Sequence, residues 1–548
     1  MESRSIKRVL FISILCLFLV IVTVVSIYIF NTTSLKNTGV GDNAQKTVVI
    51  SPLNGSLLAA QNSDNSTKRS SEIGNANYFN PADGKYYSDA NFTNAANDNT
   101  EYLKALFNSG EVVKIPAGNF LCKTKLVLKG MNLSAQGVKG ATKIVFDSKT
   151  FSNYGQGSVA ECLIINGNYS DEFKVNTAQK IDISNISFEY KRYTNRSPKT
   201  IMLFKNISEA NIRNCNFIAD LANTMPVTNL DIYNGCKNVT VSNCNFINKT
   251  KALSGGCIWV RNLTDSLENV VGNTTENIKI NDCSFEKDSK DEVIAIYSTV
   301  GNVRNVIINN CKIEDYSDKQ EIVLSVYSSE DKYYGTVDNV TISNNEIISK
   351  KFNAFVICTG IENRKKPTTN VSIYNNIITL ESINSKNKTV VYNPLSNMES
   401  NIYAANNIIT LTGGTNTNAI TNLTSAEGNK ISGPFKYGIT GGVAINNVIS
   451  GAETGIISPE LAVRNNVTKV KYGIRSFNGD SYIKSNTIEL DKNTGLYAVE
   501  LSTQYQIYCA NNTIQTYDAN QFGIIAKGPK IILSNNEVLG DGKTLISK

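Results

Sequence analysis

One short sequence motif recurs about fourteen times along this chain, and it constrains the fold more than any other feature. Two apolar residues spaced by two are followed by Asn or a substitute, then by Cys or Asn, and then by Phe or Ile. Residues 181–188, 210–217 and 239–246 are examples. Successive copies lie about 19 to 39 residues apart, which is too short for a domain and fits one small unit stacked on its neighbours.

The residue type at each position of this motif has a physical reason. Val and Ile at alternate positions predict a half-buried strand, and the Asn that follows tolerates the left-handed conformation that turns a corner. We therefore predict an all-β fold, a right-handed parallel β-helix solenoid with a short N-terminal capping helix, preceded by a transmembrane anchor. A leucine-rich repeat would need a Leu-rich consensus, and a propeller would need four strands in each longer repeat.

Stacked coils place like residues in columns. We expect the first Asn of each pair, such as Asn344, to join a ladder of buried amides, since neighbours about 4.8 Å apart can donate to one another. The next position forms a second column, which we interpret as free thiols followed by amides, with disulfides between neighbouring cysteines as the alternative. Its members are Cys215, Cys244, Cys283, Cys311, Asn345, Asn376, Asn407, Asn447 and Asn466. An apolar column runs through Phe188, Phe217, Phe246 and Phe285 and continues with Ile.

The N-terminus predicts a membrane anchor. Three basic residues and one Glu precede an uncharged run of 22 residues, Val9 to Phe30, which is long enough to span a bilayer. No small-residue cleavage site ends the run, so we favour a single-pass plasma-membrane protein with an extracellular C-terminal domain. The alternative is a cleaved signal peptide and a secreted protein. The predicted segments are a basic cytoplasmic tail (1–8), the anchor (9–30), a disordered polar spacer (31–77), a cap with the first coils (78–160) and the β-helix coils (161–548).

Composition excludes several functions. The net charge of +7 over 548 residues permits acidic glycans as partners, but no basic cluster accompanies a nucleic-acid fold signature, so we expect no nucleic acid to bind. The chain contains no histidine, which excludes Ser-His-Asp, Cys-His and His-ligated zinc mechanisms. We expect no metal and no cofactor. Calcium held by carboxylates is the alternative if the chain is a lyase.

The segment before the clear repeats resembles a known superfamily. A short amphipathic helix at residues 97–107 is followed by a strand, the turn Pro116-Ala117-Gly118 and another strand at 126–130. This order is similar to the cap and first coil of the pectin-lyase-like superfamily. The resemblance implies the β-helix fold but not one activity, because that superfamily includes lyases, hydrolases, epimerases, tailspikes and adhesins.

A comparison with the polygalacturonase family argues against hydrolysis. Residues 229–231 look like that family's N-T-D coil, but its paired Asp would fall at Gly255 and Gly256 one coil later. Glycoside hydrolysis needs two carboxyl groups, and only Asp231 stays in register. Acidic residues also cluster at 288–292 and 314–321, which we interpret as solvated loops.

One outward face remains as a candidate site. If the apolar residues of each strand point inward, alternation places two columns of polar and aromatic side chains outward. Aromatic rings beside polar groups suit the apolar faces of sugars, whereas a decorated β surface is the alternative reading. The predicted substrate-binding residues are Asp231, Tyr233, Trp259, Arg261, Tyr297 and Tyr327. We therefore predict an adhesin-like, carbohydrate-binding surface protein whose partner is a polysaccharide or cell-surface glycan. The alternative is an extracellular polysaccharide lyase or glycoside hydrolase of the superfamily.

Overall fold

The structure is a computed structural model. It describes residues 47–49, 73–109, 112–128, 132–146, 161–165, 180–191, 200–220, 227–249, 255–263, 274–317, 322–328, 335–352, 355–360, 368–382, 388–393, 400–414, 416–477, 479–502 and 504–547. The predicted anchor at 9–30 lies outside these residues, and so does the predicted spacer at 31–77 apart from residues 47–49 and 73–77. Among the described residues, no helix is long and apolar enough to cross a bilayer.

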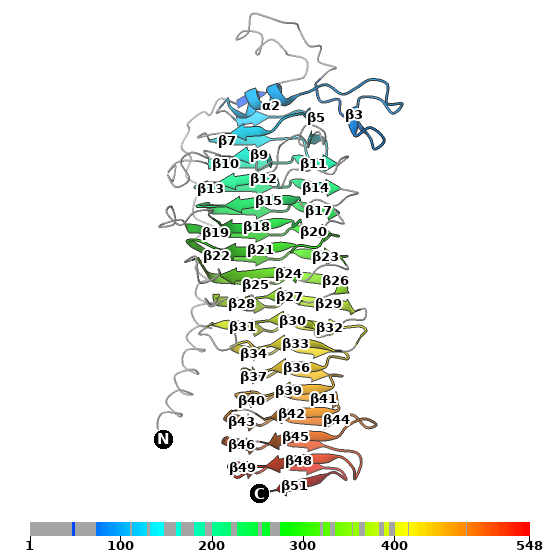
Figure 1. Ribbon diagram of the computed structural model, residues 1–548, viewed down its shortest axis with the longest axis vertical. Coiled ribbons are helices and arrows are strands. Elements are labelled where there is room, and N and C mark those ends of the chain that lie inside the picture. Colours follow the sequence, from blue (N-terminus) through cyan, green and yellow to red (C-terminus); the bar gives the residue numbers. More distant parts are fainter. Residues whose placement is uncertain are drawn as a thin grey trace, which may run out of the picture. The chain divides into compact units, whose positions relative to one another are not determined.

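Three long parallel sheets make up the compact unit Thr47–Lys548 (Figure 1). The first sheet consists of β1 (Thr47–Val49), β4 (Val112–Lys114), β7 (Leu133–Gln136), β10 (Lys180–Ser184), β13 (Glu209–Arg213), β16 (Lys237–Ser242), β19 (Thr274–Asn281), β22 (Asn302–Asn309), β25 (Thr336–Ser343), β28 (Thr369–Tyr374), β31 (Ile402–Ala405), β34 (Ser425–Glu427), β37 (Val443–Ile445), β40 (Leu461–Val463), β43 (Ser481–Lys484), β46 (Ile507–Ala510) and β49 (Ile531–Ser534).

The second sheet consists of β5 (Gly118–Cys122), β8 (Thr142–Phe146), β11 (Ser187–Lys191), β14 (Asn216–Asp220), β17 (Asn245–Lys249), β20 (Ser284–Lys287), β23 (Lys312–Asp315), β26 (Glu346–Phe352), β29 (Ile377–Ser382), β32 (Ile408–Leu411), β35 (Lys430–Ser432), β38 (Val448–Ser450), β41 (Asn466–Val470), β44 (Thr487–Leu490), β47 (Thr513–Gln515) and β50 (Glu537–Leu539).

The third sheet consists of β6 (Leu126–Leu128), β9 (Glu161–Ile165), β12 (Thr200–Lys205), β15 (Thr228–Tyr233), β18 (Ile258–Asn262), β21 (Ile294–Ser298), β24 (Ile322–Ser328), β27 (Phe355–Cys358), β30 (Lys388–Tyr392), β33 (Thr417–Thr421), β36 (Tyr437–Thr440), β39 (Thr454–Ile457), β42 (Tyr472–Ser476), β45 (Tyr497–Ser502), β48 (Phe522–Lys527) and β51 (Lys543–Ser547).

Each coil contributes one strand to each sheet and then returns to the first sheet one level further along. For example, β16, β17 and β18 form one coil, and β19 of the next coil pairs with β16 in parallel. The chain is thus a right-handed parallel β-helix, as the repeat predicts. Before the coils lie a hairpin, β2 (Tyr78–Asn80) and β3 (Lys85–Tyr87), and the helix α2 (Thr100–Phe107). The buried face of α2, which includes Leu103, joins the apolar core inside the coils.

The corners between the first and second sheets confirm the left-handed conformation expected of Asn. Asn185, Asn214 and Asn243 have φ of 60°, 54° and 50°. In later coils Gly428 and Arg464 take the same position, with φ of 63° and 55°. Gly meets no steric cost there, whereas a side chain with a Cβ must be held by its surroundings.

The buried amide ladder lies one residue beyond the predicted position. Asn344 is exposed, whereas Asn345 is almost completely buried. Asn466 is also excluded from the ladder, because Arg464 occupies the corner and Asn465 points inward. Both residues of the pair are Asn and therefore chemically identical, so only the geometry of the coil decides which one faces the core. The ladder runs through Asn345, Asn376, Asn407, Asn429, Asn447, Asn465, Asn486, Asn512 and Asn536.

The Cys and Phe columns are confirmed inside the earlier coils. Cys215, Cys244, Cys283 and Cys311 are buried and free, and each thiol donates to a carbonyl one coil away, as Cys311 Sγ does to Ile280 O at 3.6 Å. The rings of Phe217 and Phe246 stack with centroids 4.9 Å apart. Homotypic stacking therefore fills the interior, as the repeat implies.

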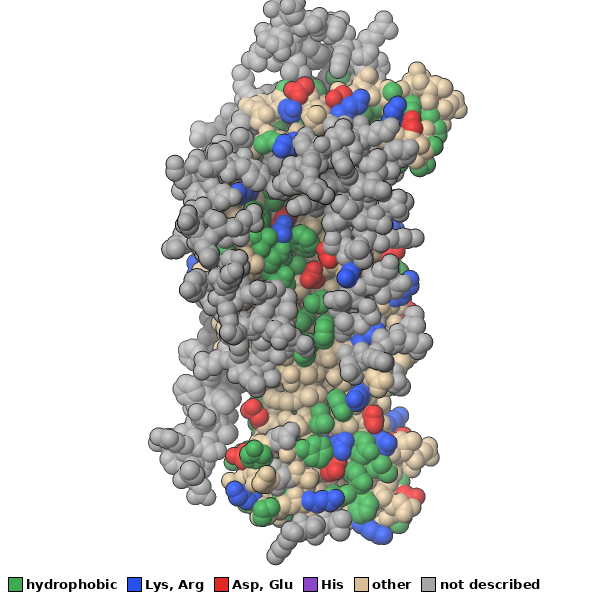
Figure 2. Space-filling model, viewed as in Figure 1, with side chains coloured by type: hydrophobic (Ala, Val, Ile, Leu, Met, Phe, Trp, Pro, Cys, Tyr) green, Lys and Arg blue, Asp and Glu red, His purple; other side chains and the backbone are tan. Residues whose placement is uncertain are grey.

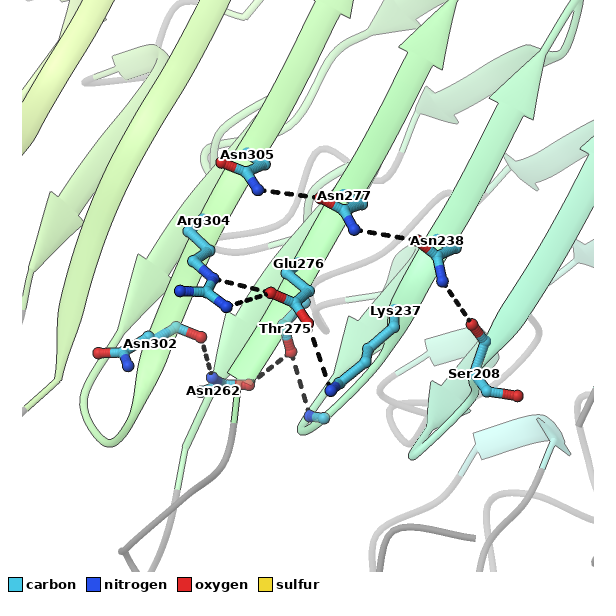
Figure 3. Close-up of polar contacts among 11 residues, drawn as sticks. Ser208, Lys237, Asn238, Asn262, Thr275, Glu276, Asn277, Asn302, Arg304 and Asn305 are labelled. Carbon is cyan, nitrogen blue, oxygen red and sulfur yellow. Dashed lines mark hydrogen bonds and ion pairs between the residues drawn. The ribbon is translucent and has the colours of Figure 1, made fainter. Parts of the chain in front are cut away.

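A second amide ladder, on the outside of the first sheet, was not predicted (Figure 3). Asn277 Nδ2 donates to Asn238 Oδ1 at 3.0 Å, and Asn305 Nδ2 donates to Asn277 Oδ1 at 2.9 Å. Asn339 continues the series by donating to Asn305 at 2.8 Å. Asn238 and Asn339 each begin an Asn-x-Thr sequence, so a glycan on either amide nitrogen would compete with these ladder bonds.

Candidate functional site

The six predicted site residues lie on the outer face of the third sheet, on β15, β18, β21 and β24. Asp231 is the register partner of Trp259, and Tyr233 is the partner of Arg261. Arg261 pairs in turn with Tyr297. Tyr327 follows Tyr297 on the next coil. The two predicted columns are therefore confirmed, while their role in binding stays a prediction.

An ion pair between adjacent coils organises this site. Arg261 Nε lies 3.0 Å from Asp231 Oδ1, and Arg261 Nη2 donates to Asp231 Oδ2. Arg261 Nη1 donates to the hydroxyl of Tyr297 at 2.6 Å. Asp231 is 1% exposed, and the Arg261 side chain is 17% exposed. Asp231 thus faces outward from the sheet but lies beneath the guanidinium, which is the part of the pair that solvent reaches.

The charges of this pair depend on each other. Burial raises the pKa of Asp231, and the guanidinium opposes that shift. Burial alone would lower the pKa of Arg261, but Asp231 and Tyr297 raise it above its ordinary value. Arg261 therefore stays protonated, and its attraction for the Asp231 carboxylate counteracts part of the effect of burial on that carboxyl group.

Aromatic rings surround the guanidinium. The Arg261 Cζ lies 4.5 Å from the ring centroid of Trp259, 5.4 Å from that of Tyr233 and 5.8 Å from that of Tyr297. Tyr297 and Tyr327 stack with centroids 5.0 Å apart and planes 9° from parallel. The half-buried rings and the guanidinium form one continuous patch, which we call the Arg261 cluster: Asp231, Tyr233, Trp259, Arg261, Tyr297 and Tyr327.

Gly256 makes room for the only Trp in the chain. A Cβ on Gly256 would lie 2.6 Å from Trp259 Nε1 and 2.6 Å from the carbonyl oxygen of Glu292. Next to it, Gly255 donates its N–H to the carboxylate of Asp291 at 2.7 Å. Gly256 therefore has a structural role, since the absence of a side chain lets the indole of Trp259 lie close to the backbone.

The acidic segments are more buried than solvated loops would be. Asp315 is 1% exposed and Lys287 is completely buried, and burial raises the pKa of Asp315 and lowers that of Lys287. Burial also raises the pKa of Asp291 and of Glu292. Asp318 and Glu321 lie outside the described residues. Within the described parts of the chain, no group of three Asp, Glu, Cys or His residues is placed to hold a metal ion.

Two features of the site could not be anticipated from the sequence motif. Asn229, the first residue of the segment resembling N-T-D, is completely buried and donates to the carbonyl of Phe217 at 2.9 Å, so it serves the fold. Glu292 lies near the cluster instead: burial raises the pKa of Tyr297 to about 12, and Asp231 and Glu292 both add to that shift. The register of the strands does not predict the approach of a carboxylate from a neighbouring loop.

Several solved structures resemble the chain at low identity. PfbA, a surface adhesin of Streptococcus pneumoniae, aligns with a TM-score of 0.43 and 15% identity, over 66% of this chain and 92% of that one. A tailspike protein of E. coli bacteriophage HK620 aligns with a TM-score of 0.39 and 12% identity, over 81% and 75% of the two chains. A Family 28 exopolygalacturonase of Yersinia enterocolitica aligns with a TM-score of 0.28 and 10% identity, over 82% and 76%.

No protein-family model matches the sequence, and no curated protein matches it either.

Proposed function

We propose that this chain is an adhesin-like surface protein that binds a carbohydrate through the Arg261 cluster without cleaving it. The observation that carries this proposal is the guanidinium of Arg261, held by Asp231 and set among aromatic rings on an outward sheet face. Ring faces stack on the apolar faces of sugars. Among the described residues, Asp231 and Tyr297 engage three of the five guanidinium N–H groups, so further donors remain for a sugar hydroxyl or carboxylate.

The proposal includes export and membrane anchoring through residues 9–30, with the β-helix outside the cell. The support is the uncharged run after a basic start. Protease added to intact cells should then digest the coils, while the protein sediments with membranes. Recovery of the full-length chain from the soluble cytoplasm would contradict both parts.

Binding is tested by titrating the full chain, in mild detergent, with acidic and neutral polysaccharides. Stacking contacts contribute on the order of 1 kcal/mol each, so Trp259→Ala combined with Tyr297→Ala should weaken binding by about tenfold or more. The matched control is Tyr482→Ala with Tyr508→Ala, because these rings are also neighbours in register but lie on the first sheet. Undiminished binding by the first double variant, with melting temperatures unchanged, would remove the cluster from the proposal.

A hydrolase or lyase is the second candidate, and one observation favours it: Asp231 and Glu292 both lie near Tyr297. Two carboxyl groups are what hydrolysis requires. Against it, the register neighbours of Asp231 on the next coils are Trp259, Ala295 and then Ser325, none of them acidic. Rapid release of reducing ends or unsaturated uronates, abolished by Asp231→Asn or Glu292→Gln, would establish the enzyme and overturn the proposal.

A further inference from the structure

A second cluster of the same design lies near the C-terminal end of the third sheet. Tyr472, Tyr497 and Phe522 are register partners on β42, β45 and β48. Arg475 and Glu500 are partners on the same strands. All five side chains are half-buried on the outer face. Figure 2 shows apolar and charged side chains gathered at two levels of this face, one over β15–β21 and one over β42–β48.

Arg475 makes the same types of contact as Arg261, although it lies in the register column of Asp231 and Trp259 rather than in that of Arg261. Arg475 Nε donates to Glu500 Oε2 at 2.7 Å. Its Cζ lies 4.3 Å from the ring centroid of Tyr472 and 4.9 Å from that of Phe477. In both clusters an Arg pairs with a carboxylate on the adjacent coil and packs against aromatic rings. An ion pair alone stabilises a surface little, so a fold requirement does not explain why the combination recurs.

We infer that the Arg475 cluster (Tyr472, Arg475, Tyr497, Glu500 and Phe522) is a second saccharide subsite, and that one acidic polysaccharide chain spans both clusters. This inference rests on the proposed function of the Arg261 cluster. Lys471 carries the charge argument: its Nζ lies 5.3 Å from the ring of Tyr472, and it forms no ion pair with a described residue. Glu500 neutralises Arg475, so Lys471 leaves the cluster positive, which complements a uronate carboxylate.

The spacing of the two clusters sets the length of ligand. From β18 to β42 the third sheet advances by eight strands. At about 4.8 Å for each strand, the clusters are roughly 38 Å apart. Between them Phe355 and Tyr392 stack with centroids 4.8 Å apart, so the aromatic surface does not end at the first cluster. A tetrasaccharide is too short to reach both clusters, whereas a polymer reaches them together and gains affinity by avidity.

The test titrates the full chain in mild detergent with polygalacturonate, alginate and hyaluronan, with tetrasaccharides made from each, and with dextran as the neutral polymer. We expect one acidic polymer to bind at least about tenfold more tightly than its tetrasaccharide, and its affinity to fall with added salt. Calorimetry should count two tetrasaccharides per chain. Tyr472→Ala with Tyr497→Ala should reduce that count to one and abolish the polymer's advantage, whereas the Tyr482→Ala, Tyr508→Ala control should change neither.

Each failure has a distinct signature. An unchanged count and an unchanged polymer affinity in the Tyr472→Ala, Tyr497→Ala variant, folded as judged by its melting temperature, would overturn the second subsite and leave the first. The second subsite would also be overturned if the wild-type chain bound only one tetrasaccharide and only Trp259→Ala with Tyr297→Ala abolished that binding. If the remaining site depended on Tyr472 alone, the proposed function of the Arg261 cluster would fail instead. Tighter binding of dextran than of any acidic polymer would overturn the charge argument, and no binding by any probe would overturn both proposals.

Discussion

Replacing one ladder amide should destabilise the coils far more than replacing its neighbour in sequence. Asn407 is completely buried. Its Nδ2 donates to Ile373 O and to Asn429 Oδ1, both at 2.9 Å. Its Oδ1 accepts the backbone N–H of Asn376 at 3.0 Å and the Asn376 side-chain amide at 2.9 Å. Asn407→Ala removes all four hydrogen bonds at once.

The expected loss of unfolding free energy follows from the hydrogen-bond donors that lose their acceptor. The backbone N–H of Asn376 loses its acceptor, and one N–H of the Asn376 amide loses its acceptor as well. A buried donor without a partner costs about 1 to 3 kcal/mol, so the two together cost about 2 to 6 kcal/mol of unfolding free energy. Because neighbouring coils share their interfaces, the loss should appear as a lower unfolding midpoint of the surrounding coils.

The matched control is Asn406→Gly. Asn406 is exposed and has a φ of 54°, which glycine adopts freely. We expect this substitution to change stability by no more than about 0.5 kcal/mol. A graded variant, Asn536→Ala at the last rung, leaves the corresponding two donors of Asn512 without their acceptor. Its effect should fall between the two, because Asn536 is only half-buried and water can replace part of the lost hydrogen bonding.

The measurements are urea unfolding followed by circular dichroism and amide hydrogen exchange in β29 and β32, which flank the lost bonds. Exchange should accelerate there in Asn407→Ala and not in Asn406→Gly. Equal midpoints and equal exchange in these two variants would refute the ladder as a source of stability.

Two further predictions concern single residues. Gly256→Ala should displace the indole, because its Cβ would meet Trp259 and a backbone carbonyl at 2.6 Å; the fluorescence of the only Trp should shift and saccharide binding should weaken, and an unchanged spectrum would refute the close contact. Burial lowers the pKa of Lys388 to about 8, so the unfolded chain binds more protons than the folded one between about pH 8 and the ordinary lysine value near 10.4. Stability relative to Lys388→Met should therefore rise across that window in urea unfolding, and a flat or falling difference would contradict the burial of a charged amine.

The sequence predicted the coil because every position of the repeat repeats its environment. Alternating Val and Ile, a corner Asn and a stacked Phe each recur, so one local interpretation is checked about fourteen times. The ladder was placed one residue too early because Asn344 and Asn345 are chemically identical, and the choice between corner and core depends on how sharply the chain bends. The slip at Asn466 has the same origin.

For the site, strand alternation predicted which residues share an outward column, but not the contacts that their side chains make. Register alone places Asp231 beside Trp259 and Arg261 beside Tyr297. It cannot show that Asp231 is covered by Arg261, because coverage depends on the length and direction of a flexible side chain. It also cannot bring in Glu292, which approaches from outside the strand. The Arg475 cluster escaped prediction because Tyr472 and Tyr497 lie at the start of their strands, outside the two predicted columns. Arg475 does continue the column of Asp231, but only uncharged residues occupy that column in the coils between them.

A double-mutant cycle on Asp231 and Arg261 separates the contribution of the pair to stability from its contribution to binding. Asp231→Leu leaves a largely buried guanidinium without its counter-charge, which costs about 3 kcal/mol or more. Arg261→Met has the converse effect, because it leaves the buried carboxyl group of Asp231 without its cation. The double variant removes both charges and should recover most of the unfolding free energy, because two apolar side chains can fill the same space. Saccharide affinity should not recover with it, since the donors of Arg261 are gone. Recovered stability together with undiminished affinity would show that the pair only holds adjacent coils together, and that the rings bind without it.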